Sequence, residues 1–170
     1  LLSELGSIDG FQGVEASGGF DNIDQLLGTA LRDSLTGRNA PAEFILNGAD
    51  QYRSTNTLDF AAFENIIGGT GADTFGLQGV HTGDLFGGLG DDRFVFADSS
   101  ALTGRADGQL GEDELDFNAY LTGRQINLTS TGVIDGFNGT EAALTNGFFN
   151  MDKVMGSGAT SDRLTGINAV

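Results

Sequence analysis

A short motif recurs along the chain: an acidic or amide residue, then any residue, then a large apolar residue. Its copies begin at Asp33, Asn56, Asp73, Asp92, Asp113 and Asp162. The first five copies are 23, 17, 19 and 21 residues apart. A period near this length suits a chain that returns to the same face after each coil, so that short strands stack about 4.8 Å apart.

The glycine content restricts the possible folds further. Of the 170 residues 28 are Gly and one is Pro, and the glycines show no three-residue period. This composition excludes collagen and favours a β architecture rich in turns. Helical patterns are confined to residues 26–31 and 40–46, because Gly recurs too often elsewhere. We therefore predict an all-β fold, a parallel β-solenoid (β-helix or β-roll-like) with short strands, Gly-rich turns and a few longer loops.

Local patterns place some of these elements along the chain. Runs that alternate or stay apolar between Gly, Asn and Asp predict three short strands, at residues 92–97, 116–120 and 125–128. Three looser stretches are expected to form loops or longer coils: residues 6–20, 99–109 and 130–146.

A longer repeat relates the two ends of the chain. Three segments near the start have counterparts near the end: 8–13 with 134–139, 24–28 with 152–156, and 33–37 with 162–166. The offsets are 126, 128 and 129, and their slow drift indicates a few inserted residues. We therefore expect a single elongated repeat module over residues 1–170, which holds about one and a third copies of a unit of 126–129 residues and restarts near residue 134.

Charge and composition exclude several classes of function. A formal net charge of -16 leaves no basic patch for nucleic acid or for an anionic membrane surface. The absence of Cys and the presence of one His exclude disulfides, thiolate sites and multi-histidine metal centres. No apolar run is long enough for membrane insertion, and the first residues lack both Met and a basic signal region, so we expect a piece of a longer protein. The apolar fraction of 39%, including 13 Phe, is sufficient for a core.

Two nine-residue segments match the pattern G-G-x-G-x-D-x-U-x, in which U is large and apolar: residues 68–76 (GGTGADTFG) and 87–95 (GGLGDDRFV). A third segment, residues 108–116 (GQLGEDELD), departs from the pattern at Gln109. The glycines allow positive φ and inward carbonyls, the Asp adds a hard anionic ligand, and the apolar residue enters the core. These segments resemble the calcium-binding repeats of the repeats-in-toxin (RTX, hemolysin-type) family.

The resemblance implies that calcium ions (Ca²⁺) lie between such loops when the loops are one coil apart, held by backbone carbonyls and the aspartates. The first two segments are offset by 19 residues at every position, so they can face each other. The implied ligands are Gly68, Thr70 and Asp73 with Gly88, Gly90 and Asp92, and for a second site Gly108, Leu110 and Asp113. Ten acidic residues and two Arg give residues 68–116 a net charge of -8, so stacking them without cations would be repulsive.

A purely structural interpretation of the same loops, without calcium, also remains. Gly-Gly-x-Gly can simply form tight turns that the Asp side chain caps. Three further candidates have lost most of their glycines and are expected to be structural coils: residues 28–36, 51–59 and 157–165.

A wider resemblance covers most of the chain. Residues 113–128 (DELDFNAYLTGRQINL), with 149–156 and 162–166, are similar to repeats of very large secreted bacterial surface proteins and adhesins. Residues 56–69 look like a shortened version of the same succession. The resemblance implies an extracellular protein of the bacterial cell surface, exported by a type I or related pathway, which folds where calcium is millimolar.

Two functions of different classes follow. The first is a non-catalytic, calcium-stabilised structural or adhesive repeat of a large extracellular bacterial surface protein, acting as a stalk, filament or adhesion module. Its partners would be neighbouring repeats of the same chain. The alternative is a carbohydrate-binding accessory module, or a degenerate polysaccharide-acting β-helix, with cell-surface or matrix glycans as ligands. An exposed aromatic groove would favour this alternative.

Individual residues favour the first function. The phenylalanines are expected to stack in the interior, among them Phe63, Phe75, Phe94, Phe96 and Phe117. The acid pair Asp91 and Asp92 invites a glycosidase interpretation, but the calcium loop already accounts for Asp92. His81 is expected in a surface turn without a ligand role. We therefore predict that the chain is not an enzyme.

Overall fold

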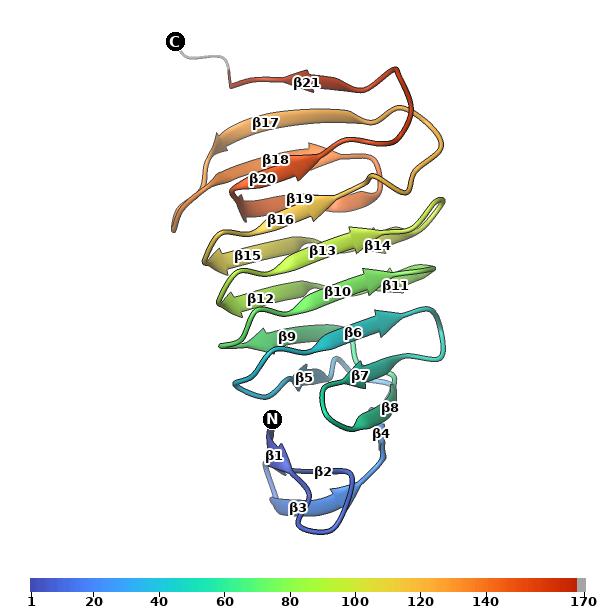
Figure 1. Ribbon diagram of the computed structural model, residues 1–170, viewed down its shortest axis with the longest axis vertical. Coiled ribbons are helices and arrows are strands. Elements are labelled where there is room, and N and C mark those ends of the chain that lie inside the picture. Colours follow the sequence, from blue (N-terminus) through green and yellow to red (C-terminus); the bar gives the residue numbers. More distant parts are fainter. Residues whose placement is uncertain (168–170) are drawn as a thin grey trace.

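The computed structural model describes residues 1–167 of the chain, and residues 168–170 of the predicted module lie outside the described part. Within that part the protein is all-β, with many short strands in parallel and mixed sheets and no helix. The predicted all-β class is therefore confirmed. Figure 1 shows the strands stacked along the long axis of the molecule, with the N-terminus near the bottom and the last strand at the top. Residues 1–167 contain no helix long and apolar enough to span a membrane.

Two long sheets and one small sheet contain these strands. The first long sheet has the spatial order β20 (Lys153–Met155), β16 (Glu114–Asp116), β13 (Arg93–Phe96), β10 (Thr74–Leu77), β6 (Glu43–Leu46), β7 (Gln51–Arg53), β8 (Thr57–Ala61) and β4 (Gln25–Leu27). The second has the order β21 (Arg163–Thr165), β17 (Gln125–Thr131), β18 (Phe137–Glu141), β19 (Leu144–Met151), β15 (Ala106–Leu110), β12 (Leu85–Leu89), β9 (Asn65–Gly69) and β5 (Ser34–Thr36), with β11 (Val80–Thr82) and β14 (Ala101–Thr103) beside it. The small antiparallel sheet contains β1 (Leu2–Leu5), β2 (Phe11–Glu15) and β3 (Gly18–Ile23).

Parallel pairing organises the middle of the molecule. In the first sheet Phe75 lies opposite Phe94, and Phe94 lies opposite Leu115. In the second sheet β9, β12 and β15 pair in the same succession. These pairings give offsets of 19 and 21 residues, as the short motif predicted for this part of the chain. We call β9 with β10, β12 with β13, and β15 with β16 three successive levels.

The core lies between the two long sheets. Successive side chains of a strand point to opposite faces, and β10 and β13 bury every second residue accordingly. The rings of Phe44, Phe75 and Phe94 are fully buried and stack nearly parallel, with centroids 4.9 and 4.8 Å apart. This is the spacing of adjacent strands, so β6, β10 and β13 each add one ring to the stack. Other rings predicted to be internal are Phe96 and Phe117, which are fully buried, and Phe63, which is partly buried against the core.

The period of about 20 residues fails below and above the three levels. Phe75 has Phe44 beneath it in β6, whereas Leu58 of the Asn56 copy lies opposite Tyr52 in the antiparallel pair β7–β8. Above β16 the next strand is β20, because the chain first forms the antiparallel strands β17 to β19. The inserted strands therefore lengthen the spacing at both ends.

Several local predictions differ from the structure. The stretches expected as loops or longer coils contain strands, which excludes the loop alternative: residues 6–20 include β2, residues 99–109 include β14, and residues 130–146 include β18. The helical patterns coincide with strands β4 and β6, since pairing with neighbouring strands overrides a weak local preference. The strand expected at 116–120 is mostly a turn after β16, in which Tyr120 N–H donates to the Phe117 carbonyl at 2.9 Å. The strands predicted at 92–97 and 125–128 are confirmed as β13 and β17.

Candidate functional site

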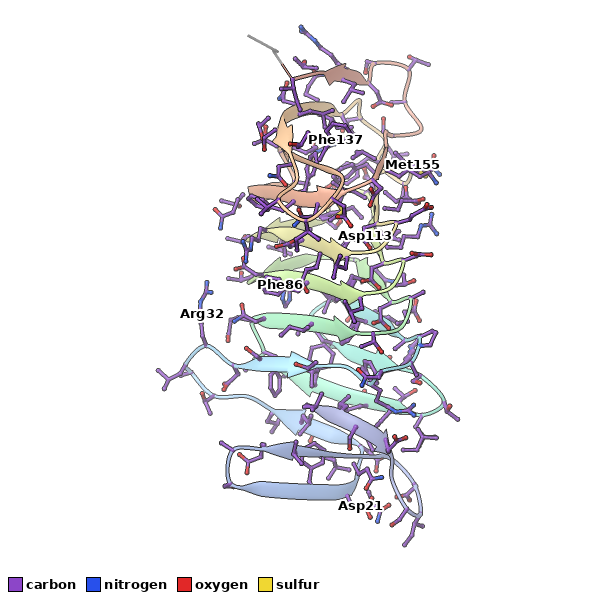
Figure 2. The ribbon with its side chains drawn as sticks, turned by 90° about the vertical axis from the view of Figure 1, so that its left-hand side faces the viewer. Asp21, Arg32, Phe86, Asp113, Phe137 and Met155 are labelled. Carbon is purple, nitrogen blue, oxygen red and sulfur yellow. The ribbon has the colours of Figure 1, made fainter. Side chains whose placement is uncertain are left out.

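Three aspartates of the glycine-rich segments lie one above another at the starts of β10, β13 and β16. Asp73, Asp92 and Asp113 are each 1% exposed or less. Each uses Oδ1 to accept a backbone N–H from the level below, at 2.8 Å in all three cases. The donors are the N–H groups of Ala42, Asp73 and Asp92. We call these three residues the aspartate column, and Asp113 is labelled in Figure 2.

The second carboxylate oxygen of each column residue, Oδ2, has no hydrogen-bond partner among residues 1–167. In Asp73 this atom lies against the first glycine of its own segment, 2.5 Å from the point that a Cβ on Gly68 would occupy. The carbonyl oxygen of Gly87, one level above, lies just as close to that point. Asp73 Oδ2 and the Gly87 carbonyl oxygen of the next level therefore both border the space where Gly68 lacks a side chain.

The arrangement repeats at the next two levels. A Cβ on Gly87 would lie closer than 3.0 Å to both Asp92 Oδ2 and the carbonyl of Gly108. A Cβ on Gly108 would meet Asp113 Oδ2 and the carbonyl of Asn150 in the same way. The first glycine of each segment is therefore required by space, because two oxygens fill the position of its missing side chain.

Burial perturbs the acidity of the column. It raises the pKa of Asp73 to about 7, of Asp92 to about 8 and of Asp113 to about 6. The backbone N–H that Oδ1 accepts acts in the opposite direction, and for Asp92 the negative charges of Asp113 and Asp73 raise the pKa further. A buried carboxylate is unfavourable without compensation. Oδ2 can therefore hold a proton, donated to the adjacent carbonyl, or face a cation.

The structure brings the three predicted aspartates together in one column but distributes the predicted carbonyls. Gly68 lies in β9, Gly88 in β12, and Gly108 with Leu110 in β15, while Thr70 and Gly90 lie in the turns that follow β9 and β12. The carbonyl of Leu110 accepts the Gly90 N–H at 3.0 Å, so the ladder already uses it. Of the predicted carbonyls, the one beside an unpartnered column oxygen is that of Gly108.

Sequence reasoning missed the carbonyls of Gly87 and Asn150. Gly87 is the first residue of the second segment, so its carbonyl can be predicted from the sequence once the stacking order of the segments is known. Asn150 is the penultimate residue of the inserted strand β19, outside any glycine-rich segment, and carries no such signal.

The donor chemistry of the column fits a hard cation. No three His, Cys, Asp or Glu side chains within residues 1–167 converge as a preformed metal cage. Each level nevertheless offers a buried carboxylate oxygen without a donor, next to a carbonyl oxygen, and oxygen-only ligation is what calcium prefers. The structural alternative expected each Asp to cap the turn of its own segment. Oδ1 instead accepts an N–H of the level below, so the cap joins two levels.

Two further residues weighed in the sequence lie elsewhere. His81 was expected in a surface turn, and this is wrong: it lies in β11, is 8% exposed, and burial lowers its pKa. Its Nε2 is 3.4 Å from the Glu64 carbonyl. Asp91 is exposed, whereas Asp92 is buried in the column, so the acid pair does not face one shared cleft.

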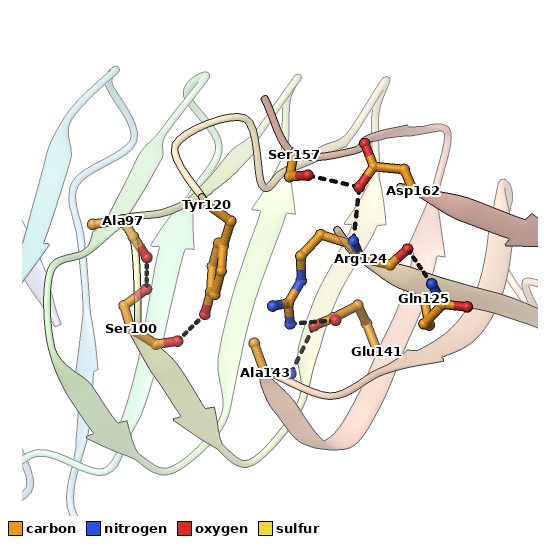
Figure 3. Close-up of polar contacts among 9 residues, drawn as sticks. All are labelled: Ala97, Ser100, Tyr120, Arg124, Gln125, Glu141, Ala143, Ser157 and Asp162. Carbon is orange, nitrogen blue, oxygen red and sulfur yellow. Dashed lines mark hydrogen bonds and ion pairs between the residues drawn. The ribbon is translucent and has the colours of Figure 1, made fainter. Parts of the chain in front are cut away.

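A second polar cluster joins strands β17 to β19 to the stack (Figure 3). The guanidinium of Arg124 forms a buried ion pair with Glu141 and lies over the ring of Tyr120, 4.0 Å from its centroid. Glu141 Oε2 also accepts the Ala143 N–H at 2.6 Å, and the Arg124 N–H donates to Asp162 at 2.7 Å. The polar groups of this cluster are bound to one another. Because these contacts link β18 to the segments before β17 and β21, the cluster anchors the inserted strands.

Comparison with protein-family models, curated proteins and solved structures finds no match to this chain. The resemblance to RTX repeats and to bacterial surface proteins therefore rests on the motif residues themselves.

Proposed function

We propose that this chain is a non-catalytic structural repeat, a parallel β-solenoid stabilised by calcium at the aspartate column. It would serve as a stalk, filament or adhesion module of a large extracellular bacterial surface protein, next to further repeats of the same kind. The observation that carries the proposal is the column itself: three buried carboxylates at successive levels, each with one oxygen bound to the level below and one oxygen unpartnered.

The solenoid interpretation is supported by the repetition between levels. Equivalent strands pair in parallel with Phe75, Phe94 and Leu115 in register, and two of the ring stacks have the spacing of adjacent strands. Long-range parallel pairing in both long sheets stacks the strands along the long axis of the molecule. Such a stack suits a load-carrying or spacing role.

The calcium interpretation is supported by charge and by donor type. Oδ2 of Asp73 and Asp92, with the carbonyls of Gly87 and Gly108, would hold one ion, and Asp92 with Asp113 would hold a second. A bound ion supplies the positive charge that the buried carboxylates lack. Its binding free energy then adds to the folded state alone, so folding would depend on the millimolar calcium found outside cells.

The carbohydrate-binding alternative calls for an exposed aromatic groove. The candidate rings Phe75, Phe94, Phe96 and Phe117 are fully buried. Phe137 is 40% exposed in an apolar groove at the C-terminal end of the stack, where it is the one aromatic residue among the described residues of the lining and so offers no stacked platform for sugar rings.

The experiment is a pair of thermal melts, in excess chelator and in millimolar calcium, on the wild type and the double variant Asp92→Asn, Asp113→Asn. An Asn keeps the accepting oxygen at Oδ1, and its Nδ2 can donate to the adjacent carbonyl. In chelator at pH 8 we expect the variant to melt higher than the wild type, because two buried charges are gone. In calcium we expect the wild-type Tm to rise and the variant Tm to change little.

A matched control uses the residues immediately before each aspartate. Asp91→Asn with Glu112→Gln removes the same charge at exposed positions. This control should keep the calcium response of the wild type. An equal calcium response in both double variants, or none in the wild type, would refute the calcium-stabilised column.

A further inference from the structure

The first and last strands of the described chain are two copies of one structure. Strands β1 to β3 and β17 to β19 each form an antiparallel meander, and each meander is followed by one short strand in either long sheet, β4 and β5 or β20 and β21. The corners agree in detail. Ile8 N–H donates to Asn22 Oδ1 at 2.9 Å, and Ile134 N–H donates to Asn150 Oδ1 at 3.2 Å. Asn22 and Asn150 share a positive φ, of 59° and 52°.

The two copies differ in what covers them. Phe11 is 0% exposed, whereas its counterpart Phe137 is 40% exposed. Leu35 is 2% exposed, whereas its counterpart Leu164 is 65% exposed. The same apolar positions are therefore buried at one end of the molecule and open to solvent at the other.

Strands β7 to β9 provide the cover in the first copy. The ring of Tyr52 meets Phe11 edge-on at 5.4 Å, and Asn56 Nδ2 donates to the Gly10 carbonyl at 2.7 Å. Strand β8 pairs with β4, and β9 pairs with β5 so that Ile66 lies opposite Leu35.

A groove occupies the corresponding place at the C-terminal end. Its volume is about 450 Å³, and its apolar lining includes Ile126, Leu128, Phe137, Val154 and Leu164. Strand β20 pairs with β16 and β21 pairs with β17, and each is the last strand of its sheet within residues 1–167. In Figure 1 β21 is the uppermost strand and β20 lies below it. Both strands contribute to the groove, β20 through Val154 and β21 through Leu164.

We propose that this groove binds a strand segment of a further repeat unit, namely the counterpart of residues 51–69 (β7 to β9). The counterparts of Tyr52, Phe60 and Ile66 would cover Phe137, Val154 and Leu164. The counterpart of Asn56 would reach the carbonyl of Gly136. This inference deepens the proposed function and rests on it, because it names the partner that a repeat module would bind at this end.

The test uses the chain with residues 167–170 replaced by a second copy of residues 38–69, which follows Gly166 directly. A control carries Ser in place of the second-copy counterparts of Tyr52, Phe60 and Ile66. Amide hydrogen exchange in β20 and β21 is the readout, since newly paired strand edges exchange slowly. We expect exchange at least about tenfold slower in the extended chain than in its control.

A second measurement reports on the groove itself. The chain contains no Trp, so Phe137→Trp places a single tryptophan in the groove, and its fluorescence can be excited selectively. Its emission should shift to shorter wavelength in the extended chain and not in the Ser control. Equal exchange and equal emission in the two extended chains would overturn the proposal.

The two proposals can fail separately. Protection of β20 and β21 concerns strand pairing at the end of the stack, so it should also appear with Asp92→Asn and Asp113→Asn in place. Protection without any calcium response would refute only the calcium-stabilised function. A calcium response without protection would refute only the docking site.

Discussion

Gly87→Ala adds a single methyl group at a point that two oxygens already occupy. The new Cβ would lie closer than 3.0 Å to Asp92 Oδ2 and to the Gly108 carbonyl. Gly87 has no positive φ, so the effect is steric and does not arise from backbone strain. Neither oxygen moves freely, because Asp92 is held by the Asp73 N–H and the carbonyl belongs to a paired strand.

The magnitude follows from these contacts. Overpacking a close-packed interior costs about 1–3 kcal/mol. Displacing the Asp92 carboxylate also breaks a buried hydrogen bond, which costs about 1–3 kcal/mol. The two costs add, so we expect Gly87→Ala to lower the free energy of unfolding by about 2–6 kcal/mol.

Gly76→Ala is the matched control, one level below in β10. Its Cβ would come no closer than 3.7 Å to another atom, the Phe44 carbonyl oxygen, which is ordinary contact. Ala also restricts the unfolded chain, so this variant should be neutral or more stable by about 0.5 kcal/mol. Urea unfolding followed by circular dichroism in calcium measures both values. Variants that differ by less than about 1 kcal/mol would refute the steric role assigned to the first glycine.

Three further predictions concern the column and its surroundings. In chelator the free energy of unfolding should fall by at least about 2 kcal/mol between about pH 5 and pH 8, because the raised pKa values of the three column aspartates favour the protonated folded state. Calcium should abolish this fall. A stability that does not change with pH in chelator would contradict the prediction. Gln109→Gly should stabilise the protein by about 1 kcal/mol in urea unfolding, because Gln109 has a φ of 73° where the other two segments have Gly; a loss of stability would contradict the strain argument. Glu141→Gln should cost about 3 kcal/mol by leaving Arg124 buried and uncompensated, whereas Glu15→Gln at the exposed equivalent position should leave the stability unchanged; equal costs would contradict the anchoring role.

The sequence predicted the parts of the fold that depend on local chemistry. The Asp-x-apolar spacing placed Phe75, Phe94 and Leu115 in register because a parallel ladder converts a constant offset into vertical alignment. The same motif placed the three aspartates at successive strand starts. These features could be predicted because they depend on residues of one coil and of the coil next to it.

Other features depend on contacts that spacing does not encode. The segment beginning at Asn56 carries the motif but forms a hairpin, since Tyr52 and Leu58 pair across β7 and β8. Spacing does not show which carbonyl borders the same glycine as each Oδ2, because that carbonyl comes from the level above, in one case from Asn150 after an insertion. His81 was placed at the surface because a Gly-bounded turn is usually exposed, whereas its strand pairs with β14.

The most direct test of calcium binding at the aspartate column is a calorimetric titration of the folded chain with millimolar calcium at pH 7.5. We expect binding of one ion between Asp73 and Asp92 and of a second between Asp92 and Asp113. This binding should be lost in the Asp92→Asn, Asp113→Asn variant and retained in the Asp91→Asn, Glu112→Gln control. The absence of calcium binding by a wild-type chain that is folded in chelator would contradict this expectation, and would leave protonated aspartates as the groups that hold the levels together.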